Sequence, residues 1–164
     1  MPVTCKMRVG EMTPPEEMIS QPAEPERVVR ILNWLLRSEI SATETYTQAI
    51  PRVASDVEVL REIAREHGQA VSELRAAIKN VGGIPDESSG IWPALPSKVY
   101  DGPAQVFGEA ATLQALKDIE ERGLGDYRNA LKRLNGTATG WISERVIPSQ
   151  REHISRLQDL LERL

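Results

Sequence analysis

The clearest indication of the fold lies in residues 28–49, which read VVRILNWLLRSEISATETYTQA. Apolar and small side chains recur there at steps of three and four residues, which is the spacing of one face of an amphipathic helix. That face consists of Val28, Leu32, Leu35, Glu39, Ala42, Tyr46 and Ala49. The stretch therefore predicts a helix that faces a core and carries one carboxylate, Glu39, on its buried side.

Three further stretches have the same period, and each also carries a polar residue on the apolar face. The second face is Val53, Val57, Leu60, Ala64, His67, Val71, Leu74 and Ile78. The third is Val106, Leu113, Glu120, Tyr127 and Leu134, and the fourth is Ile142, Val146, Gln150, His153, Leu157, Leu160 and Leu164. A buried carboxylate costs on the order of several kcal/mol unless it is paired, protonated or bound to metal. Glu39, His67, Glu120 and His153 are therefore the candidate functional residues.

Residues that start and stop helices predict where the first two helices lie. Pro25 suits a first helical position, and Pro51 follows the end of the first helix. The run Ser55-Asp56-Val57-Glu58 has the form of a capping box, in which the serine and the glutamate each bond a free backbone amide. We expect the second helix to run from there to about Asn80, before the glycine pair Gly82-Gly83.

The third and fourth helices are predicted over 103–136 and 139–163. Asn135-Gly136 is a typical helix C-cap, and Pro103 suits a helix start. Pro148 falls inside the fourth helix and lacks a backbone N–H, so it should kink or split that helix one turn before His153.

The lengths of the connections predict an all-α, antiparallel four-helix bundle. The first and last connections are short, so each joins an antiparallel hairpin, whereas residues 81–103 are long enough to cross the bundle. Glu39 and His67 are equally far from the first turn, and Glu120 and His153 from the last one. Each pair should therefore face each other at one level of the bundle. We expect a flexible N-terminal arm over 1–24 and one domain over 25–164.

Composition narrows the class of protein. The chain has 164 residues and a net charge of −4, which argues against binding nucleic acid. A single cysteine, Cys5, excludes an intrachain disulfide and a thiolate cluster. Nothing in the sequence resembles a membrane span or a signal peptide, so we expect a cytoplasmic protein.

The two predicted hairpins resemble copies of each other. Glu39 and Tyr46 have the same spacing as Glu120 and Tyr127, and an Arg-Glu pair comes directly before each of the two core histidines. This pattern is similar to the ferritin-like superfamily, with rubrerythrin and bacterioferritin as familiar members. The resemblance covers about residues 25–164 and implies that Glu39 and Glu120 match the helix carboxylates of a dinuclear iron site. His67 and His153 match its two Glu-x-x-His histidines.

The sequence departs from that pattern where the two motif glutamates should stand. Ala64 and Gln150 occupy those positions, and neither side chain supplies a carboxylate. Two interpretations remain open: a metal-free buried polar network, and a single Fe, Mn or Zn ion held by Glu39, His67, Glu120 and His153 with Gln150 outside the ligands. Glu66 and Glu152 point away from the apolar faces and are expected on solvated surface. Tyr46 and Tyr127 are interpreted as core aromatics.

Three functions are compatible with this pattern. The preferred one is a stress-related structural or interaction module with a degenerate dinuclear site, which is not an enzyme. The alternatives are a metal-dependent oxidoreductase acting on oxygen or peroxide, and a metal-binding or storage protein with a mononuclear site. The first helix also carries apolar residues off its core face, namely Val29, Trp34, Leu36 and Ile40. They favour a homodimer, with the crossover residues Ile91, Trp92 and Leu95 covering part of that surface.

Overall fold

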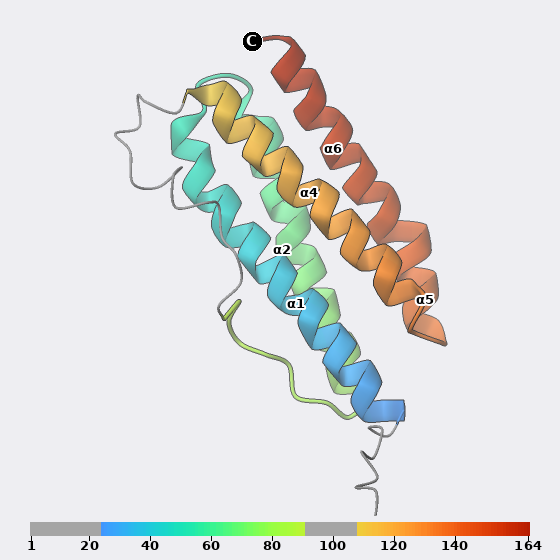
Figure 1. Ribbon diagram of the computed structural model, residues 1–164. Coiled ribbons are helices and arrows are strands. Elements are labelled where there is room, and N and C mark those ends of the chain that lie inside the picture. The colour runs from blue at the N-terminus through green and yellow to red at the C-terminus, as the bar shows by residue number, and fades with distance from the viewer. Residues whose placement is uncertain (1–23, 91–107) are drawn as a thin grey trace, which may run out of the picture.

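A computed structural model describes residues 24–90 and 108–164 of the chain. Within these residues the fold is an all-α bundle without β-strands, as predicted (Figure 1). The helices are α1 (Glu24–Ala49), α2 (Val57–Asn80), α4 (Glu109–Leu131), α5 (Thr137–Trp141) and α6 (Ile147–Glu162). The shorter turns are η1 (Ile50–Arg52) and η2 (Ile142–Val146). Residues 1–23, most of the predicted arm, lie outside the described residues.

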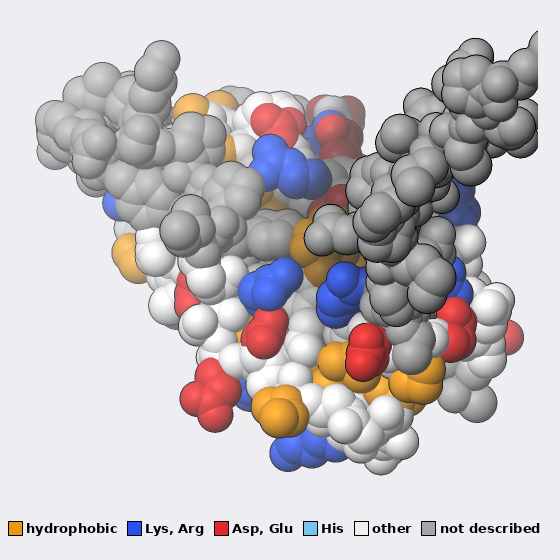
Figure 2. Space-filling view, turned by 60° about the horizontal axis from the view of Figure 1, so that its bottom comes forward, with side chains coloured by type: hydrophobic (Ala, Val, Ile, Leu, Met, Phe, Trp, Pro, Cys, Tyr) orange, Lys and Arg blue, Asp and Glu red, His pale blue; other side chains and the backbone are white. Residues whose placement is uncertain are grey.

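The bundle consists of two antiparallel hairpins. Helices α1 and α2 form one, and α4 packs along α6 to form the other, with α1 beside α4 where the hairpins meet (Figure 1). None of the described helices is long and apolar enough to span a membrane. Charged side chains of both signs are interspersed with scattered apolar ones on the face shown in Figure 2.

The apolar core has two clusters, with a polar layer between them. One cluster gathers the first turns of α1, the last turns of α2 and α4, and the η2 region, including Leu32, Leu74 and Ile142. The other lies toward the opposite end and includes Leu60 and Leu157. Along each long helix, the polar residue predicted on the apolar face falls between the residues of the two clusters. The amphipathic pattern thus placed most of the described core residues correctly, but Leu164, predicted on the fourth core face, is 59% exposed, and Val106 lies outside the described residues.

The predicted capping box at the start of α2 is wrong. The residue before α2 is Asp56, which adopts a left-handed backbone conformation with φ of 49° and makes no capping bond through its side chain. Ser55 turns instead toward α4, where its backbone N–H and its hydroxyl both donate to the Glu109 carboxylate. This contact joins the turn of the first hairpin to the start of the second.

The predicted C-terminus of the third helix is also wrong. Helix α4 ends at Leu131, and the carbonyl of Ala130 accepts bonds from the backbone N–H groups of both Arg133 and Leu134. Gly136 has φ of 84° and supplies a turn before α5 rather than a cap on α4. The predicted start at Pro103 lies outside the described residues.

Pro148 does not split the fourth helix. The helix is continuous from α5 through η2 to α6, and η2 is a π-helical segment in which the Ile147 N–H bonds the carbonyl of Ile142. Pro148 then occupies the first turn of α6. A π segment adds one residue to a helical turn, so the missing donor of the proline falls where the hydrogen-bond pattern has already shifted.

The segment after α2 follows α1. Asn33 donates to the carbonyl of Ile84 and accepts from the backbone N–H of Asp86, and Arg37 pairs with the Asp86 carboxylate at 2.8 Å. Leu36 is fully buried and belongs to the first apolar cluster, so its predicted place off the core face is wrong. The expected contacts of Ile91, Trp92 and Leu95 lie outside the described residues, and the homodimer remains a prediction.

Candidate metal centre

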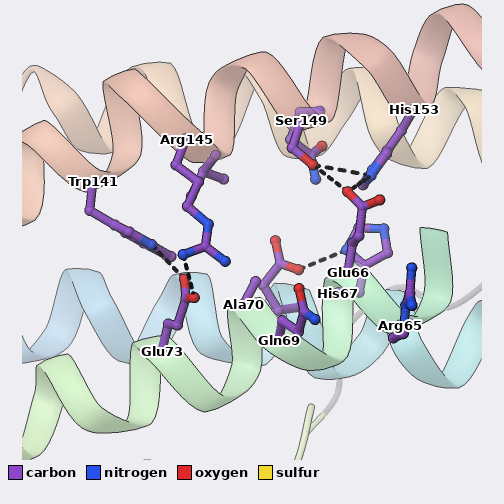
Figure 3. Close-up of a pocket in the computed structure, with 13 residues that line it drawn as sticks. Arg65, Glu66, His67, Gln69, Ala70, Glu73, Trp141, Arg145, Ser149 and His153 are labelled. Carbon is purple, nitrogen blue, oxygen red and sulfur yellow. Dashed lines mark hydrogen bonds and ion pairs between the residues drawn. The ribbon is translucent and has the colours of Figure 1, made fainter. Parts of the chain in front are cut away.

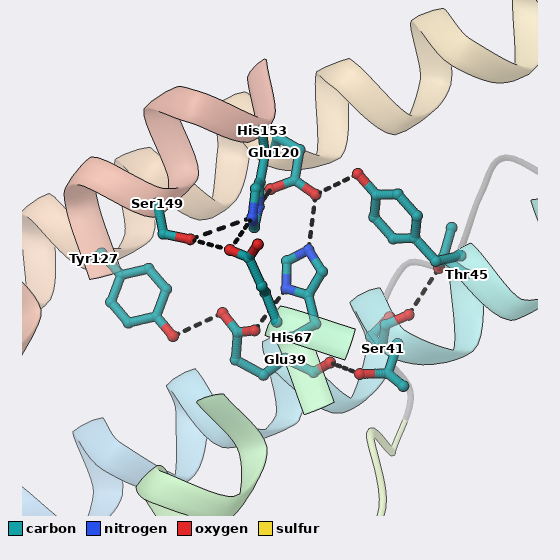
Figure 4. Close-up of polar contacts among 11 residues, drawn as sticks. Glu39, Ser41, Thr45, His67, Glu120, Tyr127, Ser149 and His153 are labelled. Carbon is teal, nitrogen blue, oxygen red and sulfur yellow. Dashed lines mark hydrogen bonds and ion pairs between the residues drawn. The ribbon is translucent and has the colours of Figure 1, made fainter. Parts of the chain in front are cut away.

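The four candidate residues meet in the layer between the two apolar clusters. Glu39 comes from α1, His67 from α2, Glu120 from α4 and His153 from α6, and each is at most 3% exposed. Figure 4 shows their side chains converging between the helices. The predicted pairing of Glu39 with His67 and of Glu120 with His153 is confirmed by ring-to-carboxylate distances of 2.7 and 3.2 Å.

His67 lies between two carboxylates of different helices. Its Nδ1 is 2.7 Å from Glu39 Oε2, and its Nε2 is 2.8 Å from Glu120 Oε1. Burial alone would lower the pKa of His67, but the charges of Glu120 and Glu39 outweigh burial and raise it well above its usual value. Without metal, this ring is therefore a doubly protonated imidazolium that donates to both carboxylates.

His153 repeats this arrangement with a different outer partner. Its Nδ1 faces Glu120 Oε2, and its Nε2 lies 2.9 Å from Glu66 Oε2, while the Ser149 hydroxyl donates to the same Glu66 oxygen at 2.7 Å. Figure 3 shows Glu66 reaching from α2 across to α6. Although burial opposes it, bonding to His153 and Ser149 lowers the pKa of Glu66. The Glu66 side chain is 36% exposed, as expected of a surface residue, but its contact with His153 was not expected.

The sequence does carry a signal for Glu66. Glu62, Glu66 and Glu73 lie at helical spacing along α2, beside its apolar face, and all three bond residues of the fourth helix. Side chains that border the apolar face of a helix lie next to the helices packed on that face, so they are placed to contact them. The sequence carries no comparable signal for Ser149, because its contact with Glu66 depends on how η2 positions the start of α6.

The two tyrosines exchange partners between the hairpins. Tyr46 of α1 donates to Glu120 of α4 at 2.7 Å, and Tyr127 of α4 donates to Glu39 of α1 at 2.7 Å. Burial, and then the facing carboxylate, raise the pKa of both hydroxyls well above the usual value, so both remain neutral donors. They are core aromatics, as interpreted from the sequence, but they also hold the two carboxylates in place. Figure 4 shows Tyr127 bonded to Glu39.

Glu120 is the most densely bonded group in the layer. Burial favours its neutral form, yet the charge of His67 and the bonds from both histidines hold its pKa far below the usual range. With its nitrogen turned toward Glu120, the Gln150 amide donates to Oε2 at 3.1 Å and to the backbone carbonyl at 3.2 Å. A Cβ on Gly123 would lie 3.0 Å from that amide, so glycine leaves room for it.

A cavity of about 210 Å³ lies beside the layer, between α2 and the fourth helix (Figure 3). Glu66, Ser149 and His153 line it on one side, and Glu73 lines it on the other, where it accepts from the Trp141 indole at 2.6 Å and pairs with Arg145 at 2.8 Å. The cavity connects the edge of the His153 ring with the outside of the bundle.

The side chains present do not fit a dinuclear iron centre. Such centres take a glutamate three residues before each histidine. Ala64 has no donor atom and packs against the second apolar cluster, and Gln150 offers a neutral amide already engaged with Glu120. A second metal ion would therefore lack the two carboxylates that hold both ions in such centres.

The same layer does fit one metal ion. His67, Glu120 and His153 each offer a ligand atom, and these atoms lie within 4.8 Å of one another. Each ring turns one nitrogen toward Glu120 and has the other held by a different carboxylate, Glu39 or Glu66. Metal-binding histidines in proteins usually have their second nitrogen held in this way.

The sequence of this chain matches the profile of one known protein family. Residues 27–133 match the profile of a family described as a domain of unknown function, DUF2383. The chain belongs to this family. Comparison with curated proteins gave no match. For this DUF2383 member, then, any activity has to be argued from the site itself.

Solved structures with the same fold confirm the ferritin-like bundle. A ferritin-like diiron-carboxylate protein from Bacillus anthracis str. Ames is 17% identical, with a TM-score of 0.67 over 86% of this chain and 99% of that one. Rhodobacter capsulatus bacterioferritin, solved with a metal-free dinuclear site and heme iron, is 22% identical, with a TM-score of 0.68 over 84% of each chain. At these identities the likeness establishes the fold of this DUF2383 member.

Proposed function

We propose that this protein is a ferritin-like structural or interaction module that holds one divalent transition-metal ion through His67, Glu120 and His153. The observation that carries the proposal is the orientation of the two rings: one nitrogen of each faces Glu120, and a separate carboxylate holds the other. Two imidazoles and one carboxylate suit iron, manganese or zinc. Glu39, predicted from sequence as a ligand, then serves to orient His67.

Charge balance supports exchange of protons for metal in this layer. His67 Nε2 and His153 Nδ1 each face one oxygen of Glu120. A divalent ion bound between them would take the place of protons on these nitrogens, so its charge would be offset by the protons that it displaces. Binding would therefore avoid the large cost of adding net charge to a buried site.

The ion would act as a crosslink in this proposal. His67, Glu120 and His153 belong to α2, α4 and α6, so one ion would connect both hairpins. When bound, the metal supplies a positive charge that fixes three ligands of three helices. Ala64 and Gln150 support this structural role over dinuclear oxygen chemistry, because both motif carboxylates are replaced.

Metal titration of chelator-treated protein tests the proposal. Zinc or manganese should bind at one ion per chain, and His153→Ala should abolish binding. Glu39→Gln should keep one ion with weaker affinity, since outer-shell changes usually cost about 10- to 100-fold. Glu62→Gln is a matched control, because Glu62 is on the same acidic stripe but pairs with Arg156 rather than with a histidine, and it should bind metal normally. Absence of binding, or two ions per chain, would refute the proposal.

Stability and turnover separate the structural role from the alternatives. A crosslinking ion at a hundred times its Kd raises the free energy of unfolding by about 2.7 kcal/mol, and chelator removes this gain. Peroxide consumption by the metal-loaded protein would favour the oxidoreductase, and binding of many ions per chain would favour storage.

A further inference from the structure

The cavity beside the metal centre extends from the buried layer to the surface of the bundle (Figure 3). Its inner part is lined by residues of the layer itself, namely Glu39, His67, Gln150 and His153. Its outer part is lined by Glu73 and Arg145, whose side chains are 33% and 60% exposed. A volume of about 210 Å³ holds several water molecules at roughly 30 Å³ each, so a cation that keeps part of its water shell fits inside.

Carboxylates stand at both ends of this cavity, on one side of α2. Glu66, Ala70 and Glu73 follow one another there at steps of four and three residues, and all three line the cavity. Figure 3 shows the small side chain of Ala70 between the two carboxylates. Arg65 and Arg145 line the cavity as well, and their positive charge opposes the entry of a cation. The carboxylates are therefore needed to attract one.

The outer carboxylate is held in two ways. Trp141 donates its indole N–H to Glu73 Oε2 at 2.6 Å, and Arg145 pairs with Glu73 Oε1 at 2.8 Å. The indole bond positions the carboxylate at the mouth of the cavity without adding charge. The Arg145 side chain is largely exposed, and an ion pair of this kind contributes little to stability. Arg145 can therefore leave Glu73 to an incoming cation.

The inner carboxylate has one oxygen left for a cation. Glu66 Oε2 bonds His153 and Ser149, whereas Glu66 Oε1 has no hydrogen-bond partner among the described residues. His153 turns Nε2 toward Glu66 and Nδ1 toward Glu120, so one ring separates Glu66 from the gap between the proposed ligands. A cation held at Glu66 is thus one side chain away from the centre.

We propose that divalent metal ions enter and leave the centre through this cavity, from Glu73 at its mouth to Glu66 beside His153, and that Arg145 slows the passage by competing for Glu73. The inference rests on the function proposed above. Carboxylate oxygens attract divalent ions, and a single carboxylate also releases them again. Glu73 and Arg145 do not contact the proposed ligands, so they affect how fast the ion moves and not how tightly it is held. Association and dissociation should therefore change by the same factor, which leaves Kd unchanged.

Metal uptake by the chelator-treated full chain tests the two sides of the mouth. Stopped-flow mixing with Zn²⁺ and a dye that competes for the ion measures association, and excess chelator measures release. Glu73→Gln should lower both rates by roughly tenfold, because the attracting charge at the mouth is lost. Arg145→Gln breaks the same ion pair from the other side and should raise both rates. An ion pair with only a structural role would give the two variants the same effect.

A matched ion pair between α2 and the fourth helix serves as the control. Glu62→Gln and Arg156→Gln break a bridge that does not line the cavity, so both variants should keep the wild-type rates. Ala70→Phe should fill the cavity and slow entry and release together. Ala76→Phe, at an exposed position of α2 outside this cavity, should not. Circular dichroism checks that each variant folds.

The outcomes separate the route from the function. Rates that change in the same direction, or not at all, in Glu73→Gln and Arg145→Gln would overturn the proposal, as would wild-type rates in Ala70→Phe. In these cases, binding of one zinc ion per chain at equilibrium would leave the function proposed above intact. Absence of zinc binding at equilibrium would overturn both.

Discussion

At the scale of single residues, the candidate site depends on groups that hold the four central side chains. Gly123 and Gln150 form one such pair, since the missing side chain at Gly123 makes space for the Gln150 amide above Glu120. Gly125 lies two positions further along the same helix, and a Cβ added there would have nothing within 4 Å. Substituting the two glycines therefore distinguishes the packing effect at Gly123 from the general gain in helix propensity expected at Gly125.

Gly123→Ala and Gly125→Ala should have different effects on stability. Gly125→Ala should raise the free energy of unfolding by up to about 1 kcal/mol, because alanine is the better helix former. Gly123→Ala should gain less or become destabilising, since its methyl group pushes Gln150 from Glu120. Urea unfolding of both variants measures the difference. Equal stabilisation by both changes would show that Gln150 tolerates the added methyl group.

The metal-free protein should lose stability at both ends of the pH range. The pKa of His67 is raised in the folded state, so its contribution is complete below its unfolded value and is lost as pH rises through the folded one. The pKa of Glu120 is lowered, so its contribution is complete above its unfolded value and is lost as pH falls toward the folded one. Urea unfolding in chelator should show the alkaline loss, and His67→Gln should reduce it, while the raised pKa values of Tyr46 and Tyr127 leave a further loss at higher pH. An unchanged alkaline slope in that variant would contradict the assignment.

At the scale of elements, the sequence predicts the structure correctly where apolar period and chain connectivity decide it. Those two features placed Glu39, His67, Glu120 and His153 in one layer, because distances from a hairpin turn are fixed by helical rise. The predictions were wrong where a residue has a tertiary partner. Ser55 has the right neighbours for a capping box, but Glu109, more than fifty positions away, takes its hydroxyl. Glu66 was missed because its partner lies on another helix.

Because η2 is a π-helical segment, deleting one residue within it should affect stability much less than deleting one residue from the regular part of α6. Ser143 is exposed in η2, and deleting it should convert the wide turn to an ordinary α turn and keep both flanking faces in register. Ser155 is equally exposed in the regular part of α6, and its deletion should rotate Leu157 and Leu160 by about 100° out of the core. Thermal melts should show a folded protein for the first deletion and severe loss for the second. Equal loss in both would contradict this account of η2.

At the scale of the whole molecule, Ala64 and Gln150 are the two positions at which this bundle departs from the motif of a dinuclear centre. Restoring both motif carboxylates by Ala64→Glu/Gln150→Glu should raise the iron content of chelator-treated, reloaded protein from one to two ions per chain. Ala70→Glu, on the same helix beside the outer cavity, is the matched control for an added carboxylate and should leave one ion. Elemental analysis gives the number of iron ions per chain. A double variant that still holds one ion would show that restoring these two carboxylates is not sufficient for a dinuclear centre.

The exchange of tyrosines has a consequence for how such a chain could have arisen. Glu39 receives its tyrosine hydroxyl bond from the second hairpin and Glu120 from the first, so each carboxylate keeps its histidine partner but lacks this bond when its hairpin stands alone. Two identical ancestral hairpins could have exchanged this bond as a symmetric pair, and joining them in one chain would preserve it. Either hairpin expressed alone should then self-associate, with a tyrosine of each copy donating to the glutamate of the other.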